Sequence, residues 1–220
     1  MTNASNAGSR IYTPTTLKLY DWWVLTISNT YAWRCSTDSI LLEHFQQYAG
    51  KKHMDIGVGT GYYLSRSRIK PESVTLVDLN PDSLKAASDR ITHKFAVQSI
   101  QHDIFRPLPA AMDHSFDSVS MFYLLHCLPG DKVSKETAIA NAAKVLKADG
   151  VLYGATILGA GVTHNKFGSM LMKFYNRKGI FNNEQDSAND LCDMLKSYFE
   201  KVDVNIFGTV AIFSATGKTE

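Results

Sequence analysis

Apolar and polar positions alternate along this chain with two different spacings, which predict strands and helices in turn. Short apolar runs predict strands at residues 53–56, 73–78, 95–101, 115–123 and 151–158. Apolar residues three and four apart predict helices at 17–29, 39–48, 81–93, 134–147, 164–176 and 186–198. This order favours right-handed crossovers and a mostly parallel sheet that helices cover on both faces.

Two local features refine these elements. Ser36 or Asp38 is placed to cap the helix at 39–48, and Gly50 is placed to stop it. Near the end of the chain, the apolar runs 201–206 and 210–215 flank residues 207–209, which contain a glycine. This arrangement predicts a hairpin, and hence one antiparallel strand in the otherwise parallel sheet.

A glycine-rich loop follows the first predicted strand. Glycines occupy positions 57, 59 and 61, and glycine allows the backbone to turn sharply and to approach a ligand closely. A helix that starts near Thr60 adds unpaired N–H groups, so the loop is suited to a nucleotide-like ligand. The dinucleotide fingerprint G-x-G-x-x-G would require glycine where Tyr62 stands, which opposes a nicotinamide oxidoreductase.

Acidic residues stand at the ends of three predicted strands. Asp55 precedes the glycines, and its carboxylate suits a ligand amine or the loop backbone. Asp78 follows Gly61 by 78 − 61 = 17 residues, near the spacing of an acidic residue that accepts ribose hydroxyls. Asp78 could instead cap the next helix, but Asn80 can take that role. Asp103 ends the third strand and, taken alone, is also typical of a turn.

These motifs resemble those of the class I S-adenosylmethionine-dependent methyltransferases. The segment Asp55-x-Gly57-x-Gly59-x-Gly61 looks like the first motif of that family. Residues 116–129, FDSVSMFYLLHCLP, are similar to its fourth-strand signature, and the C-terminal hairpin is also similar. The resemblance spans residues from about 50 to 216. It implies an α/β fold, a three-layer Rossmann-like sandwich whose seven-stranded, mostly parallel sheet has one antiparallel strand from the C-terminal hairpin.

The resemblance implies S-adenosylmethionine (SAM) as cofactor and S-adenosylhomocysteine (SAH) as product. In this family, the position of Asp103 hydrogen-bonds the adenine amino group, and the next residue, Ile104, packs on the ring. Phe122 replaces a residue that is often small or polar, so the contact expected there is through backbone carbonyls. The expected cofactor-binding residues are Asp55, Gly57, Gly59, Thr60, Gly61, Asp78, Leu79, Asp103, Ile104, Phe122 and Tyr20.

His126 has two interpretations. It lies beyond the carboxyl end of a strand, where open α/β sheets bind ligands, and a histidine there could take a proton from the acceptor. Alternatively, it braces the following loop, as the matching histidine does in many relatives. No metal site is predicted.

Aromatic residues concentrate outside the common scaffold, in the N-terminal helices and between residues 158 and 190. Such side chains can line an apolar pocket, although helical spacing of aromatics also indicates a core. The expected substrate-binding residues are Trp33, Arg34, His164 and Tyr175, and Tyr20 with Trp33 or Arg34 is expected to close over the cofactor.

Length and charge favour one domain that handles a small molecule. The 220 residues carry a net charge of +2, without the basic excess that nucleic acid or an acidic membrane attracts. No run reaches the ~18 apolar residues that a membrane span requires. Three scattered cysteines fit a cytoplasmic location. The expected parts are a tail at 1–14, a helical cap at 15–50 and a methyltransferase domain at 51–220 with a substrate lid at about 159–190.

The sequence therefore predicts methyl transfer from SAM to a small, largely apolar metabolite, as in bacterial and fungal natural-product pathways. The absence of an Asn-Pro-Pro-Tyr or Asp-Pro-Pro-Tyr motif opposes nucleic-acid and glutamine substrates. Two alternatives remain open: a protein of this fold that binds SAM but catalyses an isomerisation or cyclisation, and a non-catalytic binding partner. The acceptor and the oligomeric state are not predicted.

Overall fold

A seven-stranded sheet with the strand order β3-β2-β1-β4-β5-β7-β6 organises the chain. The computed structural model describes residues 21–219, and the side chains of residues 25–219. β7 runs antiparallel to both of its neighbours, whereas the pairings among β1 to β5 are parallel. The strands are β1 (Lys52–Ile56), β2 (Ser73–Asp78), β3 (Ala96–Gln101), β4 (Phe116–Phe122), β5 (Leu146–Ile157), β6 (Phe199–Phe207) and β7 (Val210–Lys218). The predicted fold class is confirmed.

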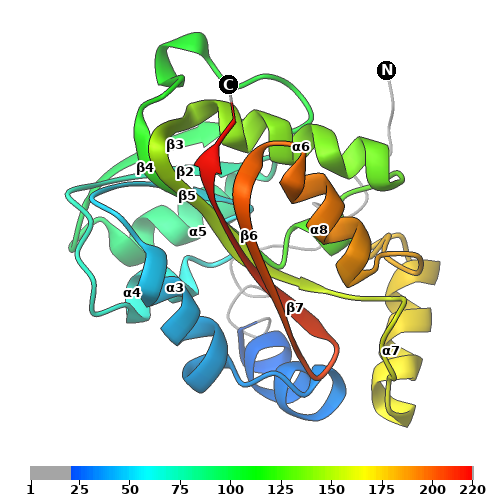
Figure 1. Cartoon of the computed structure of the whole chain (residues 1–220). Coiled ribbons are helices and arrows are strands. Elements are labelled where there is room, and N and C mark those ends of the chain that lie inside the picture. The colour runs from blue at the N-terminus through cyan, green and yellow to red at the C-terminus, as the bar shows by residue number, and fades with distance from the viewer. Residues whose placement is uncertain (1–20, 220) are drawn as a thin grey trace.

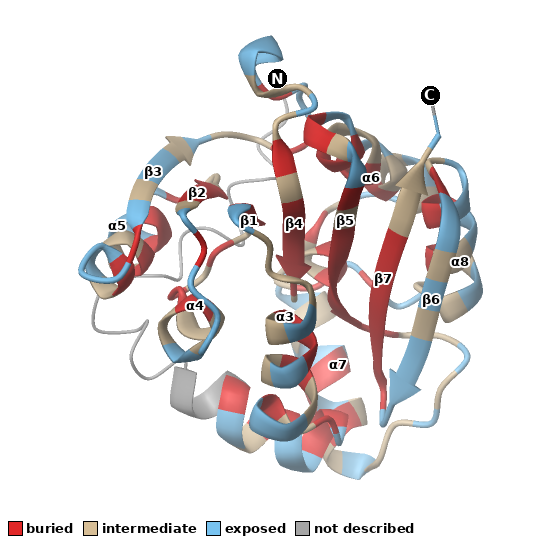
Figure 2. Cartoon of the chain, turned by 60° about the vertical axis from the view of Figure 1, so that its left-hand side comes forward, coloured by how far each residue is buried: buried red, intermediate tan, exposed pale blue. Residues whose placement is uncertain are grey.

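Helices cover both faces of this sheet (Figure 1). α3, α4 and α5 lie on one face, while α6 and α8 lie on the other. Helical segment η1 and α7 pack against each other, and α7 lies beyond the carboxyl end of β4 in Figure 2. The helical elements are η1 (Asp21–Trp33), η2 (Thr37–Leu42), α3 (Glu43–Tyr48), α4 (Tyr62–Arg66), α5 (Pro81–Ile91), η3 (Ala110–Met112), η4 (Leu125–Cys127), α6 (Lys132–Val145), α7 (Lys166–Arg177) and α8 (Ala188–Lys196).

Burial follows the position of each strand in the sheet. Most residues of the central strands β4 and β5 and of β7 are buried, whereas the edge strand β3 is largely exposed (Figure 2). The apolar residues form two clusters, one on each face of the sheet, because parallel strands covered on both sides bury both sets of alternating side chains. None of the helices within residues 21–219 combines the length and the apolar content that crossing a membrane requires.

The helix predicted at 134–147 ends two residues early, and the strand predicted from residue 151 begins at Leu146. Leu146 pairs with Phe116, and Val151 with Ser118, so residues 147–150 form an irregularity in β5. The Lys147 ammonium donates to the Asp117 carboxylate at 2.5 Å, which ties this irregularity to β4. Pairing between distant strands therefore overrides the helical spacing that extends through residue 147.

The caps and turns mostly match their sequence signals. Ser36 caps η2, because its Oγ accepts the N–H of Ser39 at 3.3 Å. Asn80 caps α5. Gly208 turns the C-terminal hairpin with a φ of +62°, and a Cβ there would lie 2.1 Å from the Trp33 carbonyl oxygen. The beginning of the helix predicted at 17–29 and the tail at 1–14 lie outside the described residues.

The strand order places a crevice at the carboxyl edge of the sheet. β1 lies between β2 and β4, so the chain leaves β1 toward one side of the sheet and later returns to its other side. Open α/β sheets bind ligands at such a switch point, outside the carboxyl ends of the strands.

Candidate active site

A cavity opens at this switch point. Its lining comes from the ends of β1, β2 and β4, from the loops that follow these strands and β3, and from η1 and the loop after α7. Of the predicted cofactor residues, those that line it are Asp55, Gly57, Gly59, Thr60, Asp78, Leu79, Asp103, Ile104 and Phe122. Gly61 is not among the lining residues, and Tyr20 lies outside the described residues.

The three loop glycines have different roles. All three have a positive φ, between +51° and +75°. A Cβ on Gly59 would meet no atom within 4 Å, whereas one on Gly57 would lie 2.9 Å from Leu124. A Cβ on Gly61 would lie 3.1 Å from the Cα of Ala87 on α5. Gly59 therefore keeps the cavity open, and Gly61 lets α4 begin close to α5.

Two carboxylates that are largely removed from water, the buried Asp55 and the partly buried Asp78, line the cavity. Asp55 is 7% exposed, and its Oδ1 accepts a hydrogen bond from Ser120 Oγ at 2.5 Å. Burial raises the pKa of Asp55 to about 6, and the nearby Asp78 carboxylate adds to this shift. Burial also raises the pKa of Asp78 to about 6, although the N–H of Asn80 donates to its Oδ1 at 2.8 Å. Removal from water is the dominant cause in both cases.

Asp103 and Ile104 line the cavity from the loop after β3. The Asp103 Oδ1 accepts the N–H of Phe105 at 3.1 Å, so this carboxylate also shapes a turn, as the sequence allowed. Ile104 is 5% exposed and packs into the cluster beside α6. His102 and Phe105 of the same loop also line the cavity and were not predicted.

Aromatic side chains form another wall. Phe122 lies 4.6 Å from Tyr63 between ring centroids, and both line the cavity. Tyr123 has a φ of +58°, and its hydroxyl donates to Asn29 Oδ1 at 2.7 Å. The sequence did not identify Tyr63 and Tyr123, although the aromatic positions beside the glycine loop and at the end of the fourth strand were visible signals. Leu25 and Ile180 complete the lining on this side.

His126 lies behind the cavity and not in its lining. It is 2% exposed, and its Nδ1 accepts the N–H of Ile157 at 3.2 Å. Its ring packs against Phe181 at 4.5 Å. Burial lowers the pKa of His126 to about 3, and the positive charge of Lys135 contributes. These contacts favour the bracing role over that of a proton acceptor, and the catalytic assignment stays an untested prediction.

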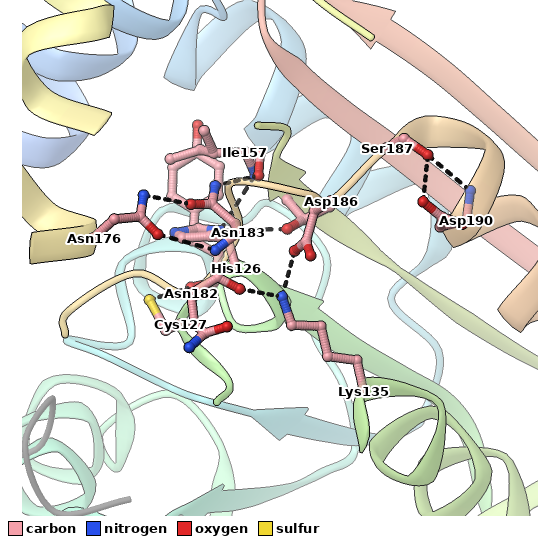
Figure 3. A network of polar contacts seen from close by, with 12 residues as sticks. His126, Cys127, Lys135, Ile157, Asn176, Asn182, Asn183, Asp186, Ser187 and Asp190 are labelled. Atoms are coloured by element: carbon pink, nitrogen blue, oxygen red, sulfur yellow. Dashed lines mark hydrogen bonds and ion pairs between the residues drawn. The ribbon is translucent and has the colours of Figure 1, made fainter. Parts of the chain in front are cut away.

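A buried polar network holds the loop that follows α7 (Figure 3). Lys135, 1% exposed, donates to the Asp186 carboxylate at 2.5 Å and to the Asn182 carbonyl at 2.6 Å. The N–H of Asn182 donates in turn to the His126 carbonyl at 2.8 Å. The network therefore joins this loop to the segment 125–129, part of which borders the cavity. No sequence signal separated Lys135 from an exposed helix lysine.

The four predicted substrate residues do not line the cavity. Trp33 is 1% exposed and lies 6.1 Å from both His164 and Phe181 between ring centroids. Tyr175 packs on Phe181 at 4.7 Å, and Arg34 donates to the Thr163 carbonyl at 2.6 Å. Trp33, His164 and Tyr175 thus meet at one aromatic cluster beneath the hairpin and α7, as the core alternative predicted. Their direct contact with substrate stays an untested prediction.

Comparison with known proteins identifies the family. A family model described as "Methyltransferase domain" matches residues 54–154. The uncharacterized protein YbcY of Escherichia coli (strain K12) is 52% identical over 194 residues, which cover 87% of this chain and 98% of that protein. The physcion biosynthesis cluster O-methyltransferase of Aspergillus chevalieri is 44% identical over 209 residues, or 94% of each chain.

Solved structures agree on the fold. A SAM-dependent methyltransferase from Thermotoga maritima superposes with a TM-score of 0.66 at 18% identity, covering 98% of this chain and all of that one. The N-methyltransferase NodS from Bradyrhizobium japonicum, in complex with SAH, gives a TM-score of 0.59 at 15% identity, with full coverage of both chains. The chain belongs to the class I SAM-dependent methyltransferases and is a methyltransferase that uses SAM.

Proposed function

We propose that this enzyme binds SAM in the described cavity and transfers the methyl group to an oxygen atom of a small, largely apolar metabolite. The observation that carries the proposal is the meeting of three acidic residues, Asp55, Asp78 and Asp103, in one cavity beside an aromatic wall. Each comes from the end of a different strand, so their meeting depends on the fold and not on local sequence.

The electrostatics of the cavity suit this cofactor. Within residues 21–219, neither Asp55 nor Asp78 makes an ion pair with a basic side chain. SAM carries a sulfonium and an ammonium, and a cation near two desolvated carboxylates stabilises their ionised forms. The residues present therefore fit a cationic nucleoside ligand.

Each end of the cavity suits one part of the cofactor. We assign the ribose hydroxyls to Asp78, because one carboxylate offers two acceptor oxygens. The adenine goes to Asp103 and Ile104, and the amino-acid ammonium to Asp55 and the backbone near Phe122. Because Gly59 has no side chain, the space above the loop backbone stays free for the cofactor.

We infer that the acceptor hydroxyl is acidic enough to ionise without a catalytic base from the protein. SAM supplies an activated methyl group, so the remaining task of the protein is to orient the acceptor oxygen and exclude water. His102, the histidine in the described lining, directly precedes Asp103 in the chain. An acidic hydroxyl, such as a phenol between aromatic walls, meets these conditions. The O-methyltransferase relative from a biosynthesis cluster supports oxygen as the acceptor and a role in secondary metabolism.

The lid at residues 159–190 contributes Ile180 to the cavity, which supports a role in holding the acceptor. The domain bounds 15–50 and 51–220 and the cytoplasmic location rest on the sequence pattern alone.

Mass spectrometry tests the proposal directly. Methyl-labelled SAM is incubated with the enzyme and a set of small phenols, each paired with its analogue in which the hydroxyl is blocked. The expected result is that only the phenols with a free hydroxyl become labelled. The Gly59→Arg variant should produce no label, because the arginine side chain fills the open space above the loop. Label on nitrogen or carbon, or equal labelling by the Gly59→Arg variant, would contradict it.

A further inference from the structure

A chain of buried polar side chains runs beneath the cavity between two neighbouring strands. His53 and Asp55 alternate on β1, and Ser118 and Ser120 alternate on β4. The parallel register pairs His53 with Ser118, and Asp55 with Ser120. All four are at most 7% exposed. Buried polar groups of this kind persist when they are hydrogen-bonded to one another.

An ionised Asp55 carboxylate sets one self-consistent direction for the hydrogen bonds along this chain. The ionised Asp55 carboxylate only accepts, so the contact of 2.5 Å requires the Ser120 hydroxyl to donate to its Oδ1. The Ser120 Oγ is then an acceptor toward His53 Nε2, 3.2 Å away, which places the imidazole proton on Nε2.

The other end of the chain agrees with this direction. His53 Nδ1 must be the acceptor, and the Ser118 hydroxyl donates to it at 2.8 Å. The Ser118 Oγ in turn accepts the backbone N–H of Gly50 at 2.8 Å. Burial lowers the pKa of His53 to about 3, so the imidazole is neutral as this order requires. Donation thus runs from a backbone amide through two serines and a histidine to Asp55.

We propose that Ser120 and His53 are positioning residues that hold Asp55 as an aligned, ionised carboxylate for the ammonium of the cofactor's amino-acid part. The inference rests on the proposed function, which places that ammonium at Asp55. It adds a specific dependence: the affinity for the amino-acid part, and not for the nucleoside part, depends on the hydrogen bond from Ser120.

Asp55 needs such support because burial and the nearby Asp78 carboxylate oppose its ionisation. The titratable groups near it are His53 on its own strand, Asp78 on β2 and Tyr153 on β5. Asp78 raises the pKa of Asp55 by repulsion, and burial raises it further, whereas the hydrogen bond from Ser120 lowers it. His53 is neutral and assists only by donating to Ser120.

Binding of two ligands distinguishes a positioning role of Ser120 from a general effect on the structure. SAH carries the amino-acid part, and 5′-methylthioadenosine lacks it while keeping the adenosine and the sulfur. Calorimetry on Ser120→Ala at neutral pH is expected to show about tenfold weaker SAH binding, the size of a lost hydrogen bond to a charged group, with 5′-methylthioadenosine unchanged. Ser214→Ala is the matched control, because Ser214 is also buried in the sheet but donates to Tyr48 Oη at 3.1 Å.

A pH series and a double-mutant cycle complete the test. The Ser120→Ala defect should shrink as the pH rises to about 8.5, since Asp55 ionises there even without the hydrogen bond. In an Asp55→Asn background, Ser120→Ala should have no further effect on SAH binding. If S120A does not fold, Ser118→Ala supplies the same comparison two hydrogen bonds further along the chain, beyond His53, with an expected loss of about threefold in SAH affinity alone.

Three results would each overturn the inference: equal loss of affinity for both ligands in Ser120→Ala, a loss of SAH affinity that does not vary with pH, or additive effects of Ser120→Ala and Asp55→Asn on SAH binding. Failure of the unmodified enzyme to bind SAH would instead refute the proposed function. The two failures are therefore distinguishable.

Discussion

The Lys135 ammonium lies 2.5 Å from the Asp186 carboxylate, and the two residues differ in burial: the lysine side chain is 1% exposed and the aspartate side chain 22%. Removing one partner of a buried pair leaves the other charge uncompensated. Asp186→Ala leaves the deeper charge unpaired, so it should destabilise the protein more than Lys135→Met does, by about 3–5 kcal/mol for the aspartate variant.

Urea unfolding of the two single variants and of the double variant checks this asymmetry. The double variant should be more stable than Asp186→Ala alone, because it no longer buries an unpaired ammonium. The reverse order of the single variants would show that the Asn182 carbonyl alone satisfies Lys135.

The bracing role of His126 predicts a difference between two substitutions. His126→Asn keeps a side-chain acceptor for the Ile157 N–H, whereas His126→Ala leaves that buried donor without one. The alanine variant should lose about 2–3 kcal/mol of unfolding free energy, and the asparagine variant markedly less. Denaturant unfolding measures both, with SAH affinity as the check on the site. Equal losses would argue against the hydrogen bond as the reason for a histidine here.

Alanine substitutions at two positions of the glycine loop should differ in their effects on stability and on ligand binding. Gly59→Ala adds a methyl group in open space at a φ of +51°, so it should cost only about 1–2 kcal/mol of stability but obstruct the ligand. Gly61→Ala has similar strain and also presses on the α5 backbone at 3.1 Å, so it should cost more stability. Melting temperatures and SAH titrations on both variants test this. Greater instability of the Gly59 variant would contradict the assigned roles.

The raised pKa of Asp55 predicts that this residue destabilises the free enzyme at neutral pH. Its folded pKa of about 6 exceeds the ordinary value, so the folded state keeps a proton that the unfolded state loses. Stability from this group is therefore present below the unfolded pKa and falls as the pH rises toward 6. Asp55→Asn should stabilise the ligand-free protein at neutral pH by about 2 kcal/mol, and the gain should vanish near pH 4.

The control for this prediction is Asp89→Asn. Asp89 pairs with Lys85 on the surface, where both side chains are more than half exposed, so little change is expected. The same Asp55 variant should bind SAH more weakly. A variant that is less stable at neutral pH, with unfolding followed by denaturant titration, would contradict the cost assigned to the buried carboxylate.

The sequence predicted the cofactor end of the site better than the acceptor end, for a physical reason. Asp55, Asp78 and Asp103 each end a strand, and parallel strands bring their carboxyl ends to one edge whatever the rest of the chain does. Their convergence therefore follows from secondary structure and strand order alone.

The surroundings of Trp33 and His126 depend instead on contacts between distant segments. The Trp33 ring packs against His164 and Phe181, which follow β5 and α7, and the His126 ring packs against the same Phe181. The local sequence identifies both residues as candidates for a functional site, but it does not show which distant segment covers them. The hydrogen-bonded chain from Ser118 through His53 and Ser120 to Asp55 was visible in the sequence only as alternating polar residues on two strands. The strand register shows that these residues meet.

Calorimetric titration of SAH into the enzyme tests the central claim most directly, with Asp78→Ala and Asp89→Ala as matched aspartate variants. The structure predicts one bound SAH per chain for the unmodified enzyme and for Asp89→Ala, and a loss of at least about tenfold for Asp78→Ala, whose carboxylate is assigned to the ribose. Undiminished binding by Asp78→Ala, or no binding by the unmodified enzyme, would contradict the proposed site.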